Sequence, residues 1–422
     1  MDRINTLISR YPHIPWQVLL KCDILFEGLR YTPQLKNLCP PFLRGFRPYH
    51  PHVDEQEEKP LFLPYFMVLS DRSLVLMRYS RESKYTVKPA ERTGYFYLEY
   101  DGETLCEVTF QHEPEWYKDA FIKKKTSIYS LSQHGDMLVW NVAPECEYWS
   151  DCRADGRSHR CVFCGYGGAS ERSRILHQIA GEPQIDRKVI DDVMASCSIA
   201  AHHQVANNGD FNVRHIYMVG GSMLDTSKEG ERYLIATRAL KKIDANWKIG
   251  CGSQALSAQS CEKLKEAGVD YVCFNIEVWE PEIWKQACPG KAKYIGWDEW
   301  IKRLENAVKI FGRGAVLSAF VTGIEYGEPL GFKTVEQAIA SSLEGARWML
   351  DNGIFAIFSP FSPVPGSDYE KFAGPSKDYF ITLAFEYWKL RNACGMKMPE
   401  ELVCRHCMYA QIENDMDVYA RI

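Results

Sequence analysis

From residue 137 onward, short apolar runs alternate with segments whose apolar residues recur at helical spacing. This alternation predicts an α/β fold with a parallel sheet and crossover helices. Because six such units are two short of a closed eightfold barrel, we expect a partial (βα)6 TIM-type barrel with its functional loops at the carboxyl ends of the strands. The predicted strands are Met137–Ala143, Arg214–Val219, Lys248–Ser253, Asp270–Glu277, Ala315–Thr322 and Ile354–Ser359, and the predicted helices are Asp186–Gln204, Trp297–Phe311 and Thr334–Leu350.

The chain before and after this pattern has a different texture. Aromatic-rich runs flank Asp101-Gly102, from Tyr95 to Tyr100 and from Leu105 to Phe110, and predict a β-hairpin. A helical start, a small antiparallel β-rich region and a surface loop from Pro40 to Pro60 are expected. A last helix, Pro375–Cys394, precedes an irregular tail. We therefore predict an N-terminal α+β region (1–134), the barrel (135–370) and a C-terminal helical extension with its tail (371–422).

Composition and charge narrow the class of protein. Lys and Arg number 50 against 55 Asp and Glu, giving a formal charge of -5 without a basic block, so a nucleic-acid partner is not expected. No apolar run has the length of a membrane span or the form of a signal peptide, so a cytoplasmic protein without membrane contact is expected. Fifteen cysteines form an odd set with no disulfide framework, which indicates that some of them bind metal.

Four cysteines follow the first predicted barrel strand within nineteen residues: Cys146, Cys152, Cys161 and Cys164. Four thiolates can close a tetrahedral zinc shell, and a Cys-x2-Cys pair serves zinc and iron–sulfur clusters equally well. Position at the carboxyl end of a barrel strand, with glycines following, favours the cluster.

This cysteine loop resembles that of the radical S-adenosylmethionine (SAM) superfamily. Cys161-Val162-Phe163-Cys164 matches the second and third cysteines of the family, with an aromatic residue before the last one. The usual first spacing is absent, so the first ligand is either Cys146 or Cys152, and Cys146 is preferred because it follows the strand directly. The resemblance implies that three thiolates hold a [4Fe-4S] cluster whose fourth iron binds SAM, which an electron from the cluster cleaves to a 5'-deoxyadenosyl radical. A fourth close thiolate would block this.

Further motifs at the ends of later strands match the same superfamily, nearest to its biotin synthase and hydrogenase-maturase branch. A glycine pair before Ser222 resembles the segment that holds the methionine amino group. Glu277 resembles the carboxylate that binds a ribose hydroxyl or an ammonium. The stretch from Gly323 resembles the adenine-stacking motif. Cys161, Cys164 and Glu277 are thereby implied as catalytic. The implied cofactor-binding residues are Phe163, Gly220, Gly221, Ser222, Ser253, Glu277, Gly323, Glu325 and Pro363.

A second group of cysteines lies near the C-terminus. Cys394, Cys404 and Cys407, with His406, are candidates for an auxiliary cluster or a zinc ion. Cys288 sits in a loop over the predicted barrel mouth, where it is a candidate substrate contact. The remaining cysteines in predicted helices and strands are expected to pack in the core.

Two functions are therefore weighed. The first is a radical SAM enzyme that abstracts hydrogen from a small-molecule substrate in cofactor or specialised-metabolite biosynthesis, with flavodoxin or ferredoxin as electron donor. The second is a zinc-stabilised binding protein with a catalytically silent barrel. The sequence leaves the substrate, the reaction subtype and the oligomeric state open.

Overall fold

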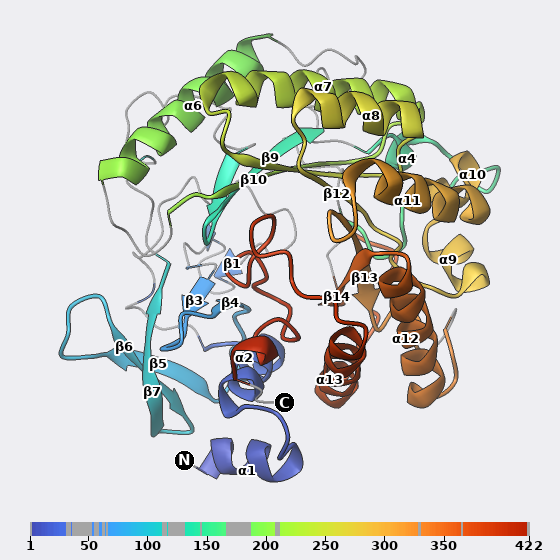
Figure 1. Cartoon of the computed structure of the whole chain (residues 1–422). Coiled ribbons are helices and arrows are strands. Elements are labelled where there is room, and N and C mark those ends of the chain that lie inside the picture. The colour runs from blue at the N-terminus through green and yellow to red at the C-terminus, as the bar shows by residue number, and fades with distance from the viewer. Residues whose placement is uncertain are drawn as a thin grey trace.

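A curled seven-stranded sheet forms the centre of the computed structural model (Figure 1). The structure describes residues 2–30, 35, 53–54, 59–60, 64, 66–111, 116, 131–143, 146–165, 187–206, 212–327, 331–363 and 366–419. The strand order is β14-β13-β12-β11-β10-β9-β8, and every neighbouring pair is parallel except β8 with β9. The strands are β8 (Leu131–His134), β9 (Met137–Ala143), β10 (His215–Gly220), β11 (Lys248–Ser253), β12 (Tyr271–Phe274), β13 (Val316–Thr322) and β14 (Ile354–Pro360).

All six predicted parallel strands are present, which confirms the partial-barrel prediction. Strand β12 ends at Phe274, three residues earlier than expected. The backbone N–H of Ile276 donates to the Ser318 hydroxyl, and Glu277 has a φ of 69°, which an extended strand does not accommodate. The edge strand β8 was not predicted. It pairs with β9 through a tight turn at Gly135-Asp136 and extends the sheet across the predicted boundary at residue 134. The domain limits stay a prediction.

Helices cover the outer face of this sheet, and Figure 1 shows α6, α7 and α8 side by side over it. The predicted helices are confirmed as α6 (Arg187–Ala206), α11 (Trp297–Phe311), α12 (Val335–Asp351) and α13 (Lys377–Ala393). Helices α7 (Thr226–Ile243) and α8 (Ala258–Ala267) were missed, although both have side-chain N-caps. The Asp225 carboxylate accepts from two backbone N–H groups of α7, and the Ser257 hydroxyl accepts from one of α8. Three short helices, α4 (Glu147–Ser150), α9 (Pro281–Ala287) and α10 (Pro289–Tyr294), lie in the loops.

The described residues of the N-terminal region include two helices and a five-stranded antiparallel sheet of order β4-β3-β7-β6-β5. The predicted hairpin is confirmed as β6–β7, with Asp101 and Gly102 at its turn. Of the predicted loop from Pro40 to Pro60, only β1 (Val53–Asp54) and β2 (Lys59–Pro60) lie among the described residues, and they pair with each other. The other elements are α1 (Asp2–Arg10), α2 (Trp16–Glu27), β3 (Phe66–Val68), β4 (Leu74–Leu76), β5 (Tyr85–Pro89), β6 (Phe96–Tyr100) and β7 (Glu103–Phe110).

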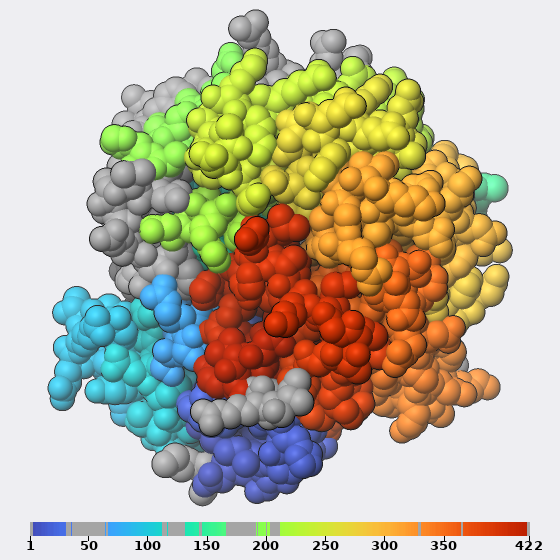
Figure 2. All heavy atoms as spheres, viewed as in Figure 1, coloured from blue at the N-terminus to red at the C-terminus, as the bar shows by residue number. Residues whose placement is uncertain are grey.

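The tail after α13 lies between the sheet and the N-terminal elements, and it ends in α14 (Met416–Tyr419) (Figures 1 and 2). Lys21 of α2 forms a buried ion pair of 2.7 Å with Asp415 of the tail. The backbone N–H of Leu76 donates to the carbonyl of Tyr409 at 3.0 Å. One hydrophobic core runs through the N-terminal helices, the barrel and the tail. No helix in the described part of the chain is both long and apolar enough to span a membrane.

Candidate active site

The first site loop begins where β9 ends, at the carboxyl edge of the parallel sheet. Cys146 precedes α4, and the next residue, Glu147, ties this loop to the one after β10. The Glu147 backbone N–H donates to the Ser222 carbonyl at 2.8 Å, and its carboxylate accepts from the backbone N–H of Leu224 at 2.6 Å. The glycine pair Gly220 and Gly221 and the cysteine loop are therefore neighbours, as their places at adjacent strand ends predict.

The thiol of Cys146 faces the second part of the cysteine loop. Burial, together with the neighbouring Cys161, raises the pKa of Cys146 to about 12. The backbone N–H of Ser222 acts in the opposite direction, because a hydrogen bond to sulfur favours the thiolate. Cys146, Cys161 and the loop after β10 thus form one cluster.

The turn from Cys161 to Cys164 is fixed by backbone hydrogen bonds on both sides. The Cys164 N–H donates to the Cys161 carbonyl at 3.0 Å. Between these cysteines, the N–H of Val162 donates to the Ala287 carbonyl at the end of α9, and the Val162 carbonyl accepts from the N–H of Tyr369. Phe163 packs against the main core. The Cys-x2-Cys turn is therefore held by backbone hydrogen bonds to the segments that follow β12 and β14.

Cys288, a residue outside the predicted ligand set, joins this cluster. A hydrogen bond between its buried thiol and Cys161, followed by burial, raises the pKa of Cys161. Cys152 has a different environment. It is exposed, forms a β-bridge with Ser158, and its sulfur lies 3.7 Å from the Ser150 carbonyl. The structure thus places Cys146 near Cys161, to which Cys164 is joined by a backbone hydrogen bond, and leaves the Cys152 side chain exposed.

Glu277 reaches the same rim from the loop after β12. Its carboxylate accepts from the Lys291 ammonium at 2.6 Å, and that ammonium also donates to the Asn275 carbonyl at 2.8 Å. Both ion-pair partners are buried. Burial lowers the pKa of Lys291, but the charge of Glu277 and the thiols of Cys288 and Cys161 more than offset this, so the pKa is raised. Glu277 therefore lies in the cluster as a carboxylate paired with an ammonium.

A buried polar network beneath the cysteine loop was not predicted. The carboxylate of Glu229, in the first turn of α7, accepts from the backbone N–H groups of Met223 and Gln254 and from the Gln254 amide. The Gln254 amide oxygen accepts from the hydroxyl of Tyr148 at 2.6 Å. Burial raises the pKa of Glu229 to about 7. Ser253, a predicted cofactor-binding residue, precedes this network at the end of β11. This network was missed at the level of sequence because helix α7, which carries Glu229, was itself missed.

Glu325 occupies a closed environment between β13, α12 and α13. Its carboxylate accepts from the Gly323 N–H at 2.6 Å, from the Ser342 hydroxyl at 3.0 Å and from the Tyr379 hydroxyl. All of its oxygens therefore have protein donors. Pro363 is the last described residue before 366 and follows β14. The cofactor-binding roles of Gly323, Glu325 and Pro363 stay predictions.

A second cluster of metal-ligand side chains lies at the opposite, amino-terminal ends of the strands. Asp136, His215, Cys404 and Cys407 are all buried, and one ligand atom of each lies within 4.8 Å of the others. Two cysteines of the predicted second metal site thus belong to a group that could hold a metal. Cys394 lies outside it, at the C-cap of α13. Asp136 and His215 were missed because they are far from the tail in sequence.

Comparison with known proteins relates part of the chain to one curated relative. No family model matches the chain. Bacteriochlorophyllide c C-7(1)-hydroxylase of Chlorobaculum limnaeum is 30% identical over 121 residues, which is 28% of this chain and 27% of the relative. The match therefore spans about a quarter of the length of that enzyme.

Three solved structures are similar to the chain at low identity. Methylornithine synthase (PylB) is 14% identical with a TM-score of 0.38, covering 67% of this chain and 75% of the other. A radical SAM methyltransferase from Sphaerobacter thermophilus is 14% identical with a TM-score of 0.40, covering 75% and 76%. Coproporphyrinogen III oxidase (HemN) from Escherichia coli, a radical SAM enzyme, is 13% identical with a TM-score of 0.34, covering 56% and 50%. The biotin synthase branch stays a prediction.

Proposed function

We propose that this chain is a radical SAM enzyme whose cluster ligands are Cys146, Cys161 and Cys164. The observation that carries the proposal is that Cys146 lies against the loop after β10, and Cys161 near Glu277, at the carboxyl ends of the barrel strands, with Cys164 in the same turn as Cys161. Functional groups of barrel enzymes gather at this end, because loops from several strands converge there.

The donor set of the site fits an iron–sulfur cluster. Thiolate is the ligand that such clusters require, and the raised thiol pKa values of Cys146 and Cys161 mean that metal must displace protons on binding. The Ser222 N–H hydrogen bond to the Cys146 sulfur stabilises its thiolate form. When bound, the cluster supplies the electron that cleaves SAM. Cys288 would stay a hydrogen-bond partner of Cys161, and Cys152 would stay off the cluster.

The other residues of the site would bind and orient the cofactor and substrate. The Gly220–Gly221 backbone offers close approach to the methionine end of SAM, since neither residue has a Cβ. Glu277 would offer its second carboxylate oxygen to a ribose hydroxyl or an ammonium while Lys291 holds the first. Abstraction of hydrogen from a small molecule shielded inside the barrel would follow.

The substrate class and partners follow from the same proposal. The curated relative is named as a bacteriochlorophyllide c C-7(1)-hydroxylase, which supports a role in cofactor or specialised-metabolite biosynthesis. Flavodoxin or ferredoxin would supply the electron, and a reducing cytoplasm would keep the thiols free for metal.

The test is anaerobic reconstitution with iron and sulfide, followed by incubation with SAM and a chemical reductant. We expect brown protein that releases 5'-deoxyadenosine, and loss of both the cluster and the product in Cys164→Ala. Cys146→Ala should behave like Cys164→Ala, whereas Cys152→Ala and the control Cys394→Ala should keep both. Colourless protein that binds zinc but no iron and cleaves no SAM would instead support the zinc-stabilised binding protein.

A further inference from the structure

The group at the amino-terminal ends of the strands combines three kinds of metal ligand from three parts of the chain. Asp136 lies in the β8–β9 turn, His215 is the first residue of β10, and Cys404 and Cys407 come from the tail. The Cys404 sulfur is 3.1 Å from Asp136 Oδ2 and 3.2 Å from Oδ1, and the Cys407 sulfur is 3.3 Å from Oδ1. The two sulfurs are 3.7 Å apart.

The buried ring of His215 indicates that a bound ligand is missing from this group. The residue is only 1% exposed, and neither ring nitrogen has a hydrogen-bond partner of normal geometry among the described residues, although the Cys404 thiol is close enough to interact with the ring. A buried imidazole with both nitrogens unsatisfied is costly, because native structures pair nearly all buried polar groups. A metal cation between His215 and the two thiols would bind a ring nitrogen and so satisfy it.

We propose that Asp136, His215, Cys404 and Cys407 bind one zinc ion in a tetrahedral site. Two thiolates on one zinc, with Zn–S bonds of about 2.3 Å, lie about 3.8 Å apart in a tetrahedron, which agrees with the 3.7 Å between Cys404 and Cys407. Thiolates that bind different irons of a cluster must stand further apart. A mixed set of two sulfurs, one nitrogen and one oxygen suits zinc, and four protein ligands leave it no open position.

The residues around the four ligands complete the site. Arg214 donates from Nε and Nη2 to the same Asp136 oxygen at 2.8 Å and 2.7 Å, which leaves the other oxygen to the metal. Such outer hydrogen bonds orient carboxylate ligands in metal proteins. The Cys407 N–H donates to the Cys404 carbonyl at 2.9 Å, so the Cys-x2-Cys segment is a tight turn with both sulfurs on one side.

The zinc would be structural and separate from the proposed active site. Asp136 directly precedes β9 and Cys146 follows it, so the seven-residue strand holds the two sites about 20 Å apart. The tail between α13 and α14 has no regular secondary structure, yet Cys404, Cys407 and Met408 are buried. A four-coordinate zinc would fasten this irregular segment to the barrel.

Metal content of the full chain tests the site. The measurement uses a Cys161→Ser/Cys164→Ser double variant as background, so that zinc bound to the active-site cysteines does not contribute to the measured content. We expect one zinc per chain by elemental analysis, retained in the added control Cys394→Ser and reduced at least tenfold in Cys404→Ser. A folded Cys404→Ser protein that keeps its zinc would overturn the proposal.

A second measurement needs no change in the four ligands. X-ray absorption at the zinc edge of the background protein should show two sulfur and two nitrogen or oxygen neighbours. Replacement of zinc by Co²⁺ should give the intense visible bands of a tetrahedral thiolate site. Iron with sulfide at this group, or folded background protein that binds neither Zn²⁺ nor Co²⁺, would overturn the proposal. Because iron reports on the active site and zinc on this one, the two proposals fail separately.

Discussion

At the scale of single residues, Glu277 has the most unusual conformation in the site. Its φ of 69° is rare for a residue other than glycine, and such conformations persist where surrounding contacts hold them. The backbone N–H of Glu277 donates to the Ala319 carbonyl of β13, and its own carbonyl accepts from the Val321 N–H. Lys291 holds the side chain. The ion pair and the two backbone bonds therefore fix a strained residue at the barrel rim.

Removal of the Lys291 ammonium should show how much the ion pair with Glu277 contributes to the free energy of unfolding. In Lys291→Met, the Glu277 carboxylate is left buried without a counter-charge, and we expect the free energy of unfolding to fall by about 3–5 kcal/mol. Urea denaturation measures the change. Adding Glu277→Gln should recover part of the loss, because the buried charge is gone. A single-variant loss below about 1 kcal/mol would mean that the pair is solvated.

At the scale of elements, two glycines of β11 lie against aromatic rings from its neighbouring strands. Tyr217 of β10 and Tyr271 of β12 lie in parallel planes with ring centroids 6.1 Å apart. A Cβ at Gly252 would come within 2.2 Å of the Tyr217 hydroxyl oxygen, and one at Gly250 within 2.0 Å of the Tyr271 ring. The alternation of glycine in β11 therefore makes room for rings from both neighbouring strands.

Gly252→Ala should destabilise the fold through this contact. We expect a loss of about 1–3 kcal/mol, typical of an added methyl group in a packed interior, measured by urea denaturation. In a Tyr217→Leu background the ring is absent, so the same glycine substitution should cost less. Equal costs in both backgrounds would show that the strand backbone, and not the ring, makes alanine unfavourable.

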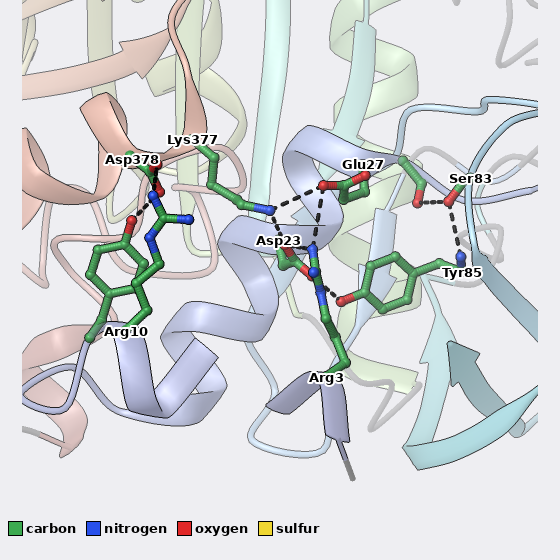
Figure 3. Close-up of polar contacts among 10 residues, drawn as sticks. Arg3, Arg10, Asp23, Glu27, Ser83, Tyr85, Lys377 and Asp378 are labelled. Atoms are coloured by element: carbon green, nitrogen blue, oxygen red, sulfur yellow. Dashed lines mark hydrogen bonds and ion pairs between the residues drawn. The ribbon is translucent and has the colours of Figure 1, made fainter. Parts of the chain in front are cut away.

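At the scale of the whole molecule, Asp23 joins the N-terminal region to the helix that follows the barrel. Its buried carboxylate accepts from Arg3 of α1 at 2.7 Å, from Tyr85 of β5 at 2.5 Å and from Lys377 of α13 (Figure 3). Arg10 and Asp378 link the same parts in an exposed ion pair (Figure 3). The buried contact should therefore carry more of the coupling.

Substitutions that remove the two contacts should lower the free energy of unfolding by different amounts. We expect Asp23→Ala to lower the free energy of unfolding by about 3 kcal/mol, because it removes the buried anion of Arg3 and Lys377 and leaves them only the exposed Glu27. Arg10→Ala should cost less than about 1 kcal/mol. Calorimetry and urea denaturation measure both, and a large Arg10 effect with a small Asp23 effect would contradict the assignment.

The same carboxylate predicts a loss of stability in acid. Burial raises the pKa of Asp23, but hydrogen bonds from Arg3, Lys377 and Tyr85 outweigh it, so the folded-state pKa lies below its ordinary value. A lowered pKa means that the contribution is present above the unfolded value, about 3.9, and is lost as the pH falls through the folded value. Asp23→Ala should therefore flatten the acid limb of the stability curve.

The sequence by itself determined the parallel strands and four of the helices that cover them. The bounds of β9, β11 and α11 agree residue for residue with the prediction, because apolar periodicity is a local property. It also identified Cys161 and Cys164 as candidate ligands, because they lie within one turn of each other. It missed β8, α7 and α8. The edge strand is stabilised by its partner β9, and the two helices depend on caps and packing as much as on periodicity.

Only the tertiary structure decided which distant residues meet. It placed Cys146 near Cys161 and left Cys152 exposed, brought Cys288 and Lys291 to the rim, and put Asp136 and His215, not Cys394, beside Cys404 and Cys407 in a group that could hold a metal. The physical reason is chain closure: local patterns fix strands and turns, whereas a ligand set drawn from residues as far apart as 136 and 407 exists only after the sheet has curled and the tail has packed against it.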